Sequence, residues 1–490
     1  MLVTVLEVLD MTIVNVALPP MMGSLGANSE EITWVLTTYI VSAAIFMPLT
    51  GLLIETIGQK KLLLINIIGF CIASMLCGLA NSLMQMIFYR TLQGIFGASL
   101  VPLSQFILRN TYSKDEQGKA MAFWGMGVMV APVLGPTLGG YITESLNWRW
   151  VFYINLPICI FALFMSIYFI KETTTHKKKI DALGLFLMMS AIGALQIFLD
   201  QGNSKDWFAS NLIAALFTFA ILAGGLFIFR GINNKENVID LSLFSNRNFA
   251  LCCILILGFM ISLFGVMAIQ PMMLESLMNY PTADAGLLMA PRALASAISM
   301  AVVSQIINKV NPKKIIITGL FCGFISCYLM SGFQLNTPAH TMIWVGIIQG
   351  IGMGLFFVPV SMVALSTLSP KQTGEASGLF SLSRSIGSSI GISLVSMLAT
   401  RETQINWHAL SSYLTDYNPN LKQWLMAHQL NIHDPMVAKL FAQQVLHKAT
   451  FTAFIDSYLL ASLGFICLLP LVFYLQIPPS HSQSSLGFEH

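Results

Sequence analysis

The chain has 490 residues, of which 56% are hydrophobic and only 10% are charged. Soluble proteins carry about 25% charged residues, so this composition, with a mean hydropathy of +0.74, excludes ordinary globular domains and indicates a protein whose solvent is the lipid bilayer. The 25 basic and 22 acidic residues leave a net charge of +3, which gives no indication of a nucleic-acid partner.

Fourteen apolar runs follow one another along the chain, and each is long enough to cross about 30 Å of hydrocarbon as a helix. The first run is expected to be a membrane helix rather than a signal peptide, because neither a basic segment nor a small-residue cleavage site accompanies it. Alternating ten-residue strands, which would indicate a barrel, are not visible. We therefore predict an all-α polytopic membrane protein with helices near residues 1–22, 33–54, 62–81, 83–108, 119–143, 149–170, 182–200, 209–229, 249–274, 284–307, 315–335, 341–367, 376–399 and 451–475.

Basic residues favour one side of these helices. Cytoplasmic loops carry an excess of Lys and Arg. With the N-terminus in the cytoplasm, six basic residues fall outside, three arginines fall within helices and sixteen fall inside. The sixteen are Lys60, Lys61, Arg109, Lys114, Lys119, Lys171, Lys177, Lys178, Lys179, Arg230, Lys235, Arg247, Lys309, Lys313, Lys314 and Lys371. This bias predicts cytoplasmic termini.

The sequence contains an internal repeat. GLLIETIGQKKLLLI at 51–65 aligns with SQIINKVNPKKIIIT at 304–318, which lies 253 residues later. Gln93 recurs as Gln349, 256 residues later. Many membrane carriers consist of two such halves, and two six-helix halves with two helices between them account for all fourteen.

This arrangement predicts two six-helix bundles, two inserted helices and one external loop. Apolar residues in that loop recur at helical spacing, which predicts short amphipathic helices on the outer membrane surface or on a partner. The predicted boundaries are 1–170 for the N-terminal bundle, 171–232 for the inserted helices, 233–399 for the next five helices, 400–450 for the periplasmic loop, 451–476 for the last helix and 477–490 for a cytoplasmic tail.

Ionisable residues near the bilayer centre are costly and are candidates for function. Glu7 and Asp10 share a face of the first helix, and Arg90 lies within about 5 Å of Asp10 in depth, so the two can pair. A buried carboxylate beside an arginine can bind a proton from one side and release it to the other, which predicts proton coupling through Asp10, Arg90 and Glu7. An ion pair that only joins two helices is the alternative, and solvation near the headgroups is the alternative for Glu7.

Further polar residues fall at the same depth and are expected to line a central substrate cavity. Acidic groups favour cations whereas arginines favour hydrophobic anions, so the charge of the substrate stays open. The repeat places Gly346 where the first half has Arg90, which suggests a task that only one half performs. The expected lining is Glu7, Gln93, Arg292, Arg384 and Gln349.

The fifth predicted helix contains APVLGPTLGGY at 131–141. Small residues at four-residue spacing permit close helix contact, and prolines bend a helix. This pattern is compatible with a contact that controls opening and with ordinary packing. The residues concerned are Ala131, Pro132, Gly135, Pro136, Gly139 and Gly140.

Motifs for ATP binding and for hydrolysis are absent from the sequence, including the P-loop, the nucleophile elbow and the HExxH pair. We therefore predict a secondary active transporter rather than an enzyme. It is expected to need no cofactor, because the proton gradient would drive it.

The motifs together resemble the major facilitator superfamily, specifically its fourteen-span drug:proton antiporters of the EmrB/QacA type. LDMTIVNVALP at 9–19 resembles the first-helix signature, and RTLQGIFGA at 90–98 resembles the fourth-helix motif. APVLGPTLGG at 131–140 resembles the fifth-helix antiporter motif and is followed by WRWVFYINLPI at 148–158. The resemblance covers essentially the whole chain.

The resemblance implies export of hydrophobic or amphiphilic drugs and toxic compounds by alternating access, in exchange for protons, from the bacterial inner membrane. It implies that Asp10 is the first-helix acid and that Arg90 is the arginine linked to proton coupling. It also implies a helix contact that controls opening, formed by Gly135, Pro136, Gly139 and Gly140.

The loop after the second helix resembles the family pattern GxLADRxGRKK but departs from it at residues 54–56. The gating salt bridges of that loop are therefore not carried over. Family members also usually have several residues before the first helix seen here. The loop residues that match or replace the pattern are Gly51, Glu55, Gly58, Lys60 and Lys61.

Transporters of this type work with a periplasmic adaptor of the EmrA type and an outer-membrane channel of the TolC type, so residues 400–450 are expected to form a docking surface. The other expected partners are small amphiphilic substrates, protons and the bilayer. Two alternatives remain open. A narrow substrate profile would favour a dedicated exporter of one endogenous metabolite, such as a siderophore, and a lack of substrate movement would favour a membrane receptor.

Overall fold

The computed structural model describes residues 1–28, 30–113, 116–173, 175, 181–233, 239–307, 309–369, 372–415, 417–428 and 434–476. Regular structure within these ranges is entirely helical. Thirteen helical segments are long and apolar enough to span a membrane, and α7 (Gln117–Ser145), with 29 residues, is a fourteenth of sufficient length. The predicted all-α polytopic fold is confirmed. The predicted tail at 477–490 and six of the counted lysines lie outside the described residues, namely Lys114, Lys177, Lys178, Lys179, Lys235 and Lys371.

The N-terminal half contains six spans, three of which are divided into shorter helices. Its helices are apolar on most faces, as expected for segments that satisfy their backbone internally within lipid. α1 packs along α7, α2 packs on α5, and α4 packs on α5 and α9. The bounds are α1 (Leu2–Leu25), α2 (Trp34–Phe46), η1 (Met47–Leu49), α3 (Thr50–Ile57), α4 (Gln59–Leu79), α5 (Leu83–Gly97), α6 (Leu100–Thr111), α7, α8 (Trp150–Tyr153) and α9 (Asn155–Phe169).

The C-terminal half repeats this arrangement with continuous helices. α12 packs along α16 and α18, α13 packs along α15, and α14 packs along α15 and α18. The 253-residue offset aligns the α3–α4 turn with the α13–α14 turn, as the repeated Lys-Lys pair predicted. The bounds are α12 (Arg247–Met272), the π-turn η4 (Met273–Leu277), α13 (Thr282–Ile306), α14 (Pro312–Met330), α15 (Ala339–Ser366), α16 (Thr373–Ser411) and α18 (Pro435–Phe473).

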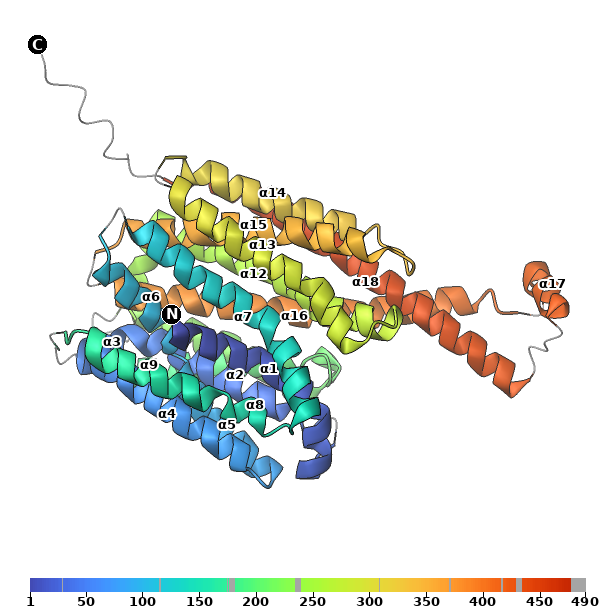
Figure 1. Ribbon diagram of the computed structural model, residues 1–490, viewed down its shortest axis with the longest axis horizontal. Coiled ribbons are helices and arrows are strands. Elements are labelled where there is room, and N and C mark those ends of the chain that lie inside the picture. The colour runs from blue at the N-terminus through green and yellow to red at the C-terminus, as the bar shows by residue number, and fades with distance from the viewer. Residues whose placement is uncertain are drawn as a thin grey trace, which may run out of the picture.

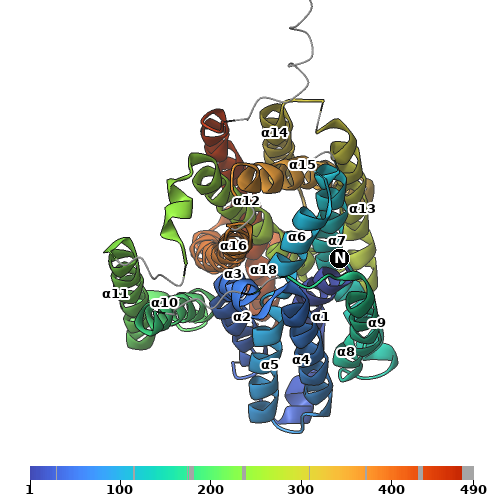
Figure 2. The ribbon, with the colours of Figure 1, turned by 90° about the vertical axis from the view of Figure 1, so that its left-hand side faces the viewer.

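Two inserted helices, α10 (Ala182–Gln201) and α11 (Asn211–Asn233), stand beside the two halves (Figure 2). α10 contacts both α2 and α16, whereas α11 packs mainly on α10. Phe198 joins the two inserted helices by packing against Trp207 in η2 (Trp207–Ala209) and against Phe217. η3 (Leu241–Ser245) then leads into the C-terminal half.

Two helices project far beyond one end of the bundle, where α17 (Pro419–Ala427) lies at the tip (Figure 1). α16 and α18 have 39 residues each, or roughly 58 Å of helix, about twice the thickness of the hydrocarbon core. The prediction of short surface helices for 400–450 was wrong for both flanks, because residues 400–411 and 436–450 contain no Gly or Pro that would end a helix. We call this end of the bundle the loop end, and the opposite end, at the α3–α4 turn, the basic end.

Candidate functional site

The centre of the N-terminal half holds a fully enclosed ion pair. Arg90 Nη1 on α5 donates to Asp10 Oδ2 on α1 at 2.6 Å, and both side chains are 0% exposed. The other carboxylate oxygen, Asp10 Oδ1, accepts from Gln93 Nε2 at 2.9 Å and from Asn155 Nδ2 at 2.7 Å. The Asp10 carboxylate therefore accepts hydrogen bonds from one guanidinium and two side-chain amides.

The guanidinium of Arg90 is held on several sides. Its Nε donates to the Val35 carbonyl at 3.0 Å, and its Nη1 also donates to Gln93 Oε1 at 2.7 Å. The guanidinium lies over the Tyr39 ring at 4.2 Å from the centroid, a cation–π contact that is strong when water is excluded. Gln93 Nε2 continues the network to Ser74 Oγ on α4 at 2.8 Å. The network therefore joins α1, α2, α4, α5 and α9.

The number of residues between each side chain and the end of its helix predicted that Asp10 and Arg90 lie at the same membrane depth and can pair. In the structure they form an ion pair. Asn155 and Ser74 were not predicted. Asn155 offered a signal, because it is the polar residue at the start of an otherwise apolar span. Gln93, which was expected to line the cavity, is instead 0% exposed and belongs to the ion-pair network.

Glu7 faces the other half of the protein. It is 2% exposed, so the alternative of solvation near the headgroups is wrong. Its Oε2 has no hydrogen-bond partner among the described residues. Arg384 on α16 lies close enough to interact with it electrostatically, and Arg384 Nη1 is likewise buried without a partner among the described residues. The helix α1 thus carries two acidic residues: Asp10 pairs with Arg90 of the N-terminal half, and Glu7 interacts with Arg384 of the C-terminal half.

Arg292 on α13 forms the polar centre of the C-terminal half. Its Nη1 donates to Gln270 Oε1 at 2.6 Å and to Gln349 Oε1 at 3.0 Å. Arg292 is 2% exposed, and within the described chain its Nε and Nη2 have no hydrogen-bond partner. Unlike Arg90, Arg292 has no acidic partner among the described residues and donates to neutral amides.

The two halves meet directly at the basic end. A Cβ atom on Gly51 would lie 2.5 Å from the backbone of Glu375 on α16, and a Cβ on Gly378 would lie 2.9 Å from the Met47 carbonyl. The two halves can approach this closely only because positions 51 and 378 carry no side chain beyond Cα. Arg109 Nη2 also reaches the Leu368 carbonyl at 3.5 Å. The basic end is therefore closed in this arrangement.

The remaining residues of the α3–α4 loop stay near their own half. Gly58 adopts φ 89°, a conformation that favours glycine, and so allows the chain to reverse. Lys60 Nζ donates to the Ile167 carbonyl at 2.8 Å. Lys61 is exposed and Glu55 is half-buried.

The small residues of α7 pack on α1, within the N-terminal half. A Cβ on Gly139 would lie 2.7 Å from the Ile13 carbonyl, and a Cβ on Gly135 would overlap Thr12. Gly140 lies to one side of this contact, 3.8 Å from Val16. Ala131 and Pro132 are buried, and the Pro136 side chain lies outside the described residues.

The opposite face of α7 meets the C-terminal half. Trp124 stacks on Phe357 of α15, with ring centroids 5.7 Å apart. A Cβ on Gly118 would lie 3.0 Å from Ile307. The contact between halves thus uses residues near the start of α7, and the sequence had singled out the contact within one half.

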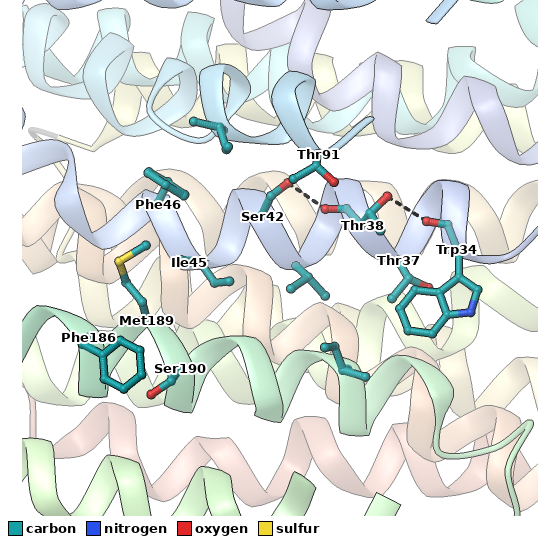
Figure 3. A pocket seen from close by; sticks show the side chains of 13 residues that line it. Trp34, Thr37, Thr38, Ser42, Ile45, Phe46, Thr91, Phe186, Met189 and Ser190 are labelled. Carbon is teal, nitrogen blue, oxygen red and sulfur yellow. Dashed lines mark hydrogen bonds between the residues drawn. The ribbon is translucent and has the colours of Figure 1, made fainter. Parts of the chain in front are cut away.

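A pocket of about 430 Å³ lies between α2, α5 and α10 (Figure 3). Trp34 and Phe186 form parts of its wall. The hydroxyls of Thr38, Ser42 and Thr91 lie along it but donate to carbonyls of their own helices. The pocket is therefore apolar, and none of the residues expected to line a central cavity borders it.

Hydrogen bonds tie α10 to both halves at the loop end. Toward the N-terminal half, Thr37 Oγ1 donates to Asp200. Toward the C-terminal half, Gln196 Nε2 donates to Ser389 Oγ at 2.5 Å and Ser393 Oγ donates to the Leu199 carbonyl at 2.6 Å. α10 therefore bridges α2 and α16, which belong to opposite halves.

Two ion pairs support the inserted helices, and their acidic members, Glu30 and Asp181, lie outside the membrane-spanning segments. Lys205 Nζ lies 2.8 Å from Glu30 Oε2, and this contact lowers the pKa of the Glu30 carboxyl. Arg230 binds Asp181 through Nε at 2.7 Å and Nη2 at 3.0 Å. These bonds lower the pKa of the Asp181 carboxyl.

Known proteins share both the sequence and the fold. EmrB of Escherichia coli K12, a multidrug export protein, is 34% identical over 97% of this chain and 94% of its own length. The fatty acid resistance protein FarB of Neisseria gonorrhoeae is 36% identical over the same shares. The human organic anion transporter MFSD10 has a similar structure, with a TM-score of 0.62, 13% identity and coverage of 95% of this chain and 97% of that one.

The proton:xylose symporter XylE is also similar in fold, with a TM-score of 0.58, 14% identity and coverage of 96% of this chain and 94% of that one. The family model of the Major Facilitator Superfamily matches residues 1–392. The protein is therefore a multi-pass membrane transporter rather than an enzyme, and it belongs to the Major Facilitator Superfamily, in which it resembles EmrB-type exporters.

Proposed function

We propose that the protein exports hydrophobic or amphiphilic compounds from the bacterial inner membrane in exchange for protons. The observation that carries this proposal is the enclosed pair of Asp10 and Arg90. Burying an ionisable pair inside the membrane costs free energy, and such residues are therefore functional candidates by default. The similarity to EmrB and FarB supports export of such compounds.

The coupling step begins with a proton binding to a carboxylate oxygen of Asp10. Protonation removes the charge attraction between Asp10 and Arg90 Nη1, which now joins α1 to α5. Glu7 lies on the same helix and interacts with Arg384 of the C-terminal half. A shift of α1 therefore changes the interaction between Glu7 and Arg384. Release of the proton to the opposite side restores the pair. A proton-motive force of about 180 mV supplies about 4 kcal/mol for each proton.

The orientation follows from the charge bias of the loops. Lys60, Lys313 and Lys314 all lie at the basic end, which we place in the cytoplasm together with both termini. The closed contact between Gly51 and Glu375 then seals the cytoplasmic side. In alternating access, export requires this contact to open for substrate loading and to close again for release.

We further propose that the projecting loop end binds a periplasmic adaptor of the EmrA type, which would connect the transporter to an outer-membrane channel of the TolC type. Several large apolar side chains are exposed there, including Tyr417 at 95%, Met426 at 67% and Met436 at 79%. Exposed apolar groups on a water-facing tip favour a protein partner. Replacing these three residues by Ser should weaken co-purification of a co-expressed adaptor, and unchanged recovery at equal transporter levels would remove this proposal.

Proton coupling is tested by reconstitution in liposomes with an imposed pH gradient. Movement of a fluorescent amphiphile and lumenal pH are followed together for the wild type and Asp10→Asn. The wild type should move both substrate and protons, and Asp10→Asn should lose gradient-driven movement. Asp456→Asn is the matched control, because Asp456 also lies on a spanning helix but is exposed. Coupled movement by Asp10→Asn would limit Asp10 to a structural role.

A further inference from the structure

Arg292 presents an unused pair of donors inside the C-terminal half. Its Nη1 is occupied by Gln270 and Gln349, whereas its Nε and Nη2 have no partner within the described chain. These two nitrogens lie on the same edge of the guanidinium, and that edge matches the two oxygens of a carboxylate. A buried cation without a counter-charge is costly, so an anionic group bound at this free edge would stabilise Arg292.

The internal repeat shows how this site differs from the proton site. The 253-residue offset relates Tyr39 to Arg292 and Ser74 to Cys327. The hydrogen bond from Gln93 to Ser74 recurs as the contact from Gln349 Nε2 to Cys327 Sγ at 3.9 Å. The two halves therefore share one polar layer, with matching amides on α5 and α15.

The cation of this layer comes from a different helix in each half. Gly346 occupies the position of Arg90, and Arg292 on α13 supplies the guanidinium in its place, beside Gly346. The sequence already placed Arg292 at this depth, but the repeat alone did not relate it to Arg90, because the guanidinium comes from a neighbouring helix. The difference is the acceptor: Asp10 neutralises Arg90, whereas the acceptors of Arg292 among the described residues are neutral amides.

Two further buried polar groups lie near Arg292. Ser296 lies one turn after Arg292 on the same face of α13, is 0% exposed, and its Oγ has no partner among the described residues. Tyr458 is close enough to Arg292 for electrostatic interaction, and its hydroxyl has only the weak acceptor Met273 Sδ at 3.6 Å. Arg230 shows the arrangement that the edge is suited to, with Nε and Nη2 both bound to Asp181.

We propose that Arg292 binds the carboxylate headgroup of an exported amphiphile, so that the substrate supplies the counter-charge that the C-terminal half lacks. The Nε and Nη2 of Arg292 hold the two carboxylate oxygens, and the Ser296 hydroxyl donates to one of them. The substrate class is hydrophobic carboxylic acids in their ionised form. This inference rests on the proposed export function, and it excludes cationic amphiphiles from this site because Arg292 repels them.

The test compares two probes with the same hydrocarbon chain and opposite headgroups, dodecanoate and dodecyltrimethylammonium. Specific binding of each labelled probe is measured with purified protein in lipid nanodiscs without a pH gradient, as the part displaced by excess unlabelled probe. Arg292→Gln should weaken dodecanoate binding at least tenfold and leave dodecyltrimethylammonium binding equal or stronger. Arg292→Lys should bind dodecanoate with intermediate affinity, since lysine keeps the positive charge but cannot donate two parallel hydrogen bonds to a carboxylate.

Arg401→Gln is the matched control, because Arg401 is exposed on the projecting part of α16, and it should bind both probes as the wild type does. The proposal is overturned if the wild type shows no specific dodecanoate binding, if Arg292→Gln binds dodecanoate normally, or if both probes lose affinity equally. Gradient-driven movement of substrate is measured in a separate experiment in liposomes. Binding that depends on Arg292 without any gradient-driven movement would leave this site standing and refute the proposed export.

Discussion

Arg90 Nη1 lies 2.6 Å from Asp10 Oδ2, and this contact neutralises the buried cation of the N-terminal half within the chain itself. Arg292, the buried cation of the C-terminal half, donates to two neutral amide oxygens and has no acidic partner in the part of the chain that the structure describes. Removing one partner of a buried pair leaves an uncompensated charge and is strongly destabilising, whereas removing an unpaired charge is not. The two arginines should therefore respond in opposite ways to the same substitution.

Arg90→Gln should lower the free energy of unfolding by about 3–5 kcal/mol, because Asp10 would lose the cation that compensates it inside the bundle. Arg292→Gln should leave stability unchanged or raise it. The measurement is the Tm of each purified variant in the same detergent at pH 7. The double variant Asp10→Asn with Arg90→Gln should recover much of the loss, because it removes both charges. Equal falls in Tm for the two single variants would contradict this account.

The sequence was sufficient to predict that Asp10 and Arg90 lie at one depth, because the rise per residue of a helix is fixed. It was not sufficient for their other partners. Asn155 and Ser74 are small polar residues on largely apolar helices, and the direction in which each points is set by how the helices pack. The acceptor Gln270 of Arg292 could not be predicted for the same reason.

Gly51→Val should open the basic end. The wild-type glycine lies against the backbone of Glu375, and a side chain there would hold α3 away from α16. Ser377, which is 0% exposed on α16 near this contact, can report the change when replaced by Cys in a background without the native cysteines. Labelling of Ser377→Cys by a membrane-impermeant maleimide should increase several-fold with Gly51→Val.

The matched control for Gly51→Val is Gly225→Val on α11, where an added Cβ meets nothing within 4 Å. It should leave labelling of Ser377→Cys at the wild-type level. If Gly51→Val also leaves labelling unchanged, the halves do not part at the contact between α3 and α16.

Gly139→Val should destabilise the N-terminal half without opening the basic end. An added side chain would be forced against the Ile13 carbonyl, which is backbone and cannot move aside cheaply. Overpacking of this kind costs about 1–3 kcal/mol. Gly140→Val is the neighbouring control, because the nearest atom there is 3.8 Å away. A lower Tm with unchanged labelling of Ser377→Cys is expected for Gly139→Val, and increased labelling would restore the gating role implied by the motif.

The spacing of small residues in α7 predicted a tight contact but not the helix that makes it. Such a pattern identifies the face of a helix, and the partner depends on the three-dimensional order of the bundle. α7 packs on α1 through one face and on α13 and α15 through another. The contact between halves, which includes Trp124, Phe357 and Gly118, lies nearer the start of α7 than the motif at 131–141 and was therefore missed.

Cross-linking α10 to α16 should stop transport. α2 and α16 belong to opposite halves, which alternating access moves relative to each other, and α10 is hydrogen-bonded to both. The bond between Gln196 and Ser389 therefore has to break, or α10 has to leave α2, in each cycle. With both residues replaced by Cys in a background without the native cysteines, a short thiol cross-linker should abolish movement of a fluorescent amphiphile in liposomes, and a cleavable linker should restore it on reduction.

The control is the pair Phe198→Cys and Phe217→Cys, which joins α10 to α11 within the inserted helices. This cross-link should leave transport intact, because α10 and α11 have no need to separate. Loss of transport only with the link to α16 would identify α10 as an element released in each cycle. Full transport with the cross-link between Gln196→Cys and Ser389→Cys in place would instead mean that α10 travels with the C-terminal half and that its contact with Thr37 is the one that breaks.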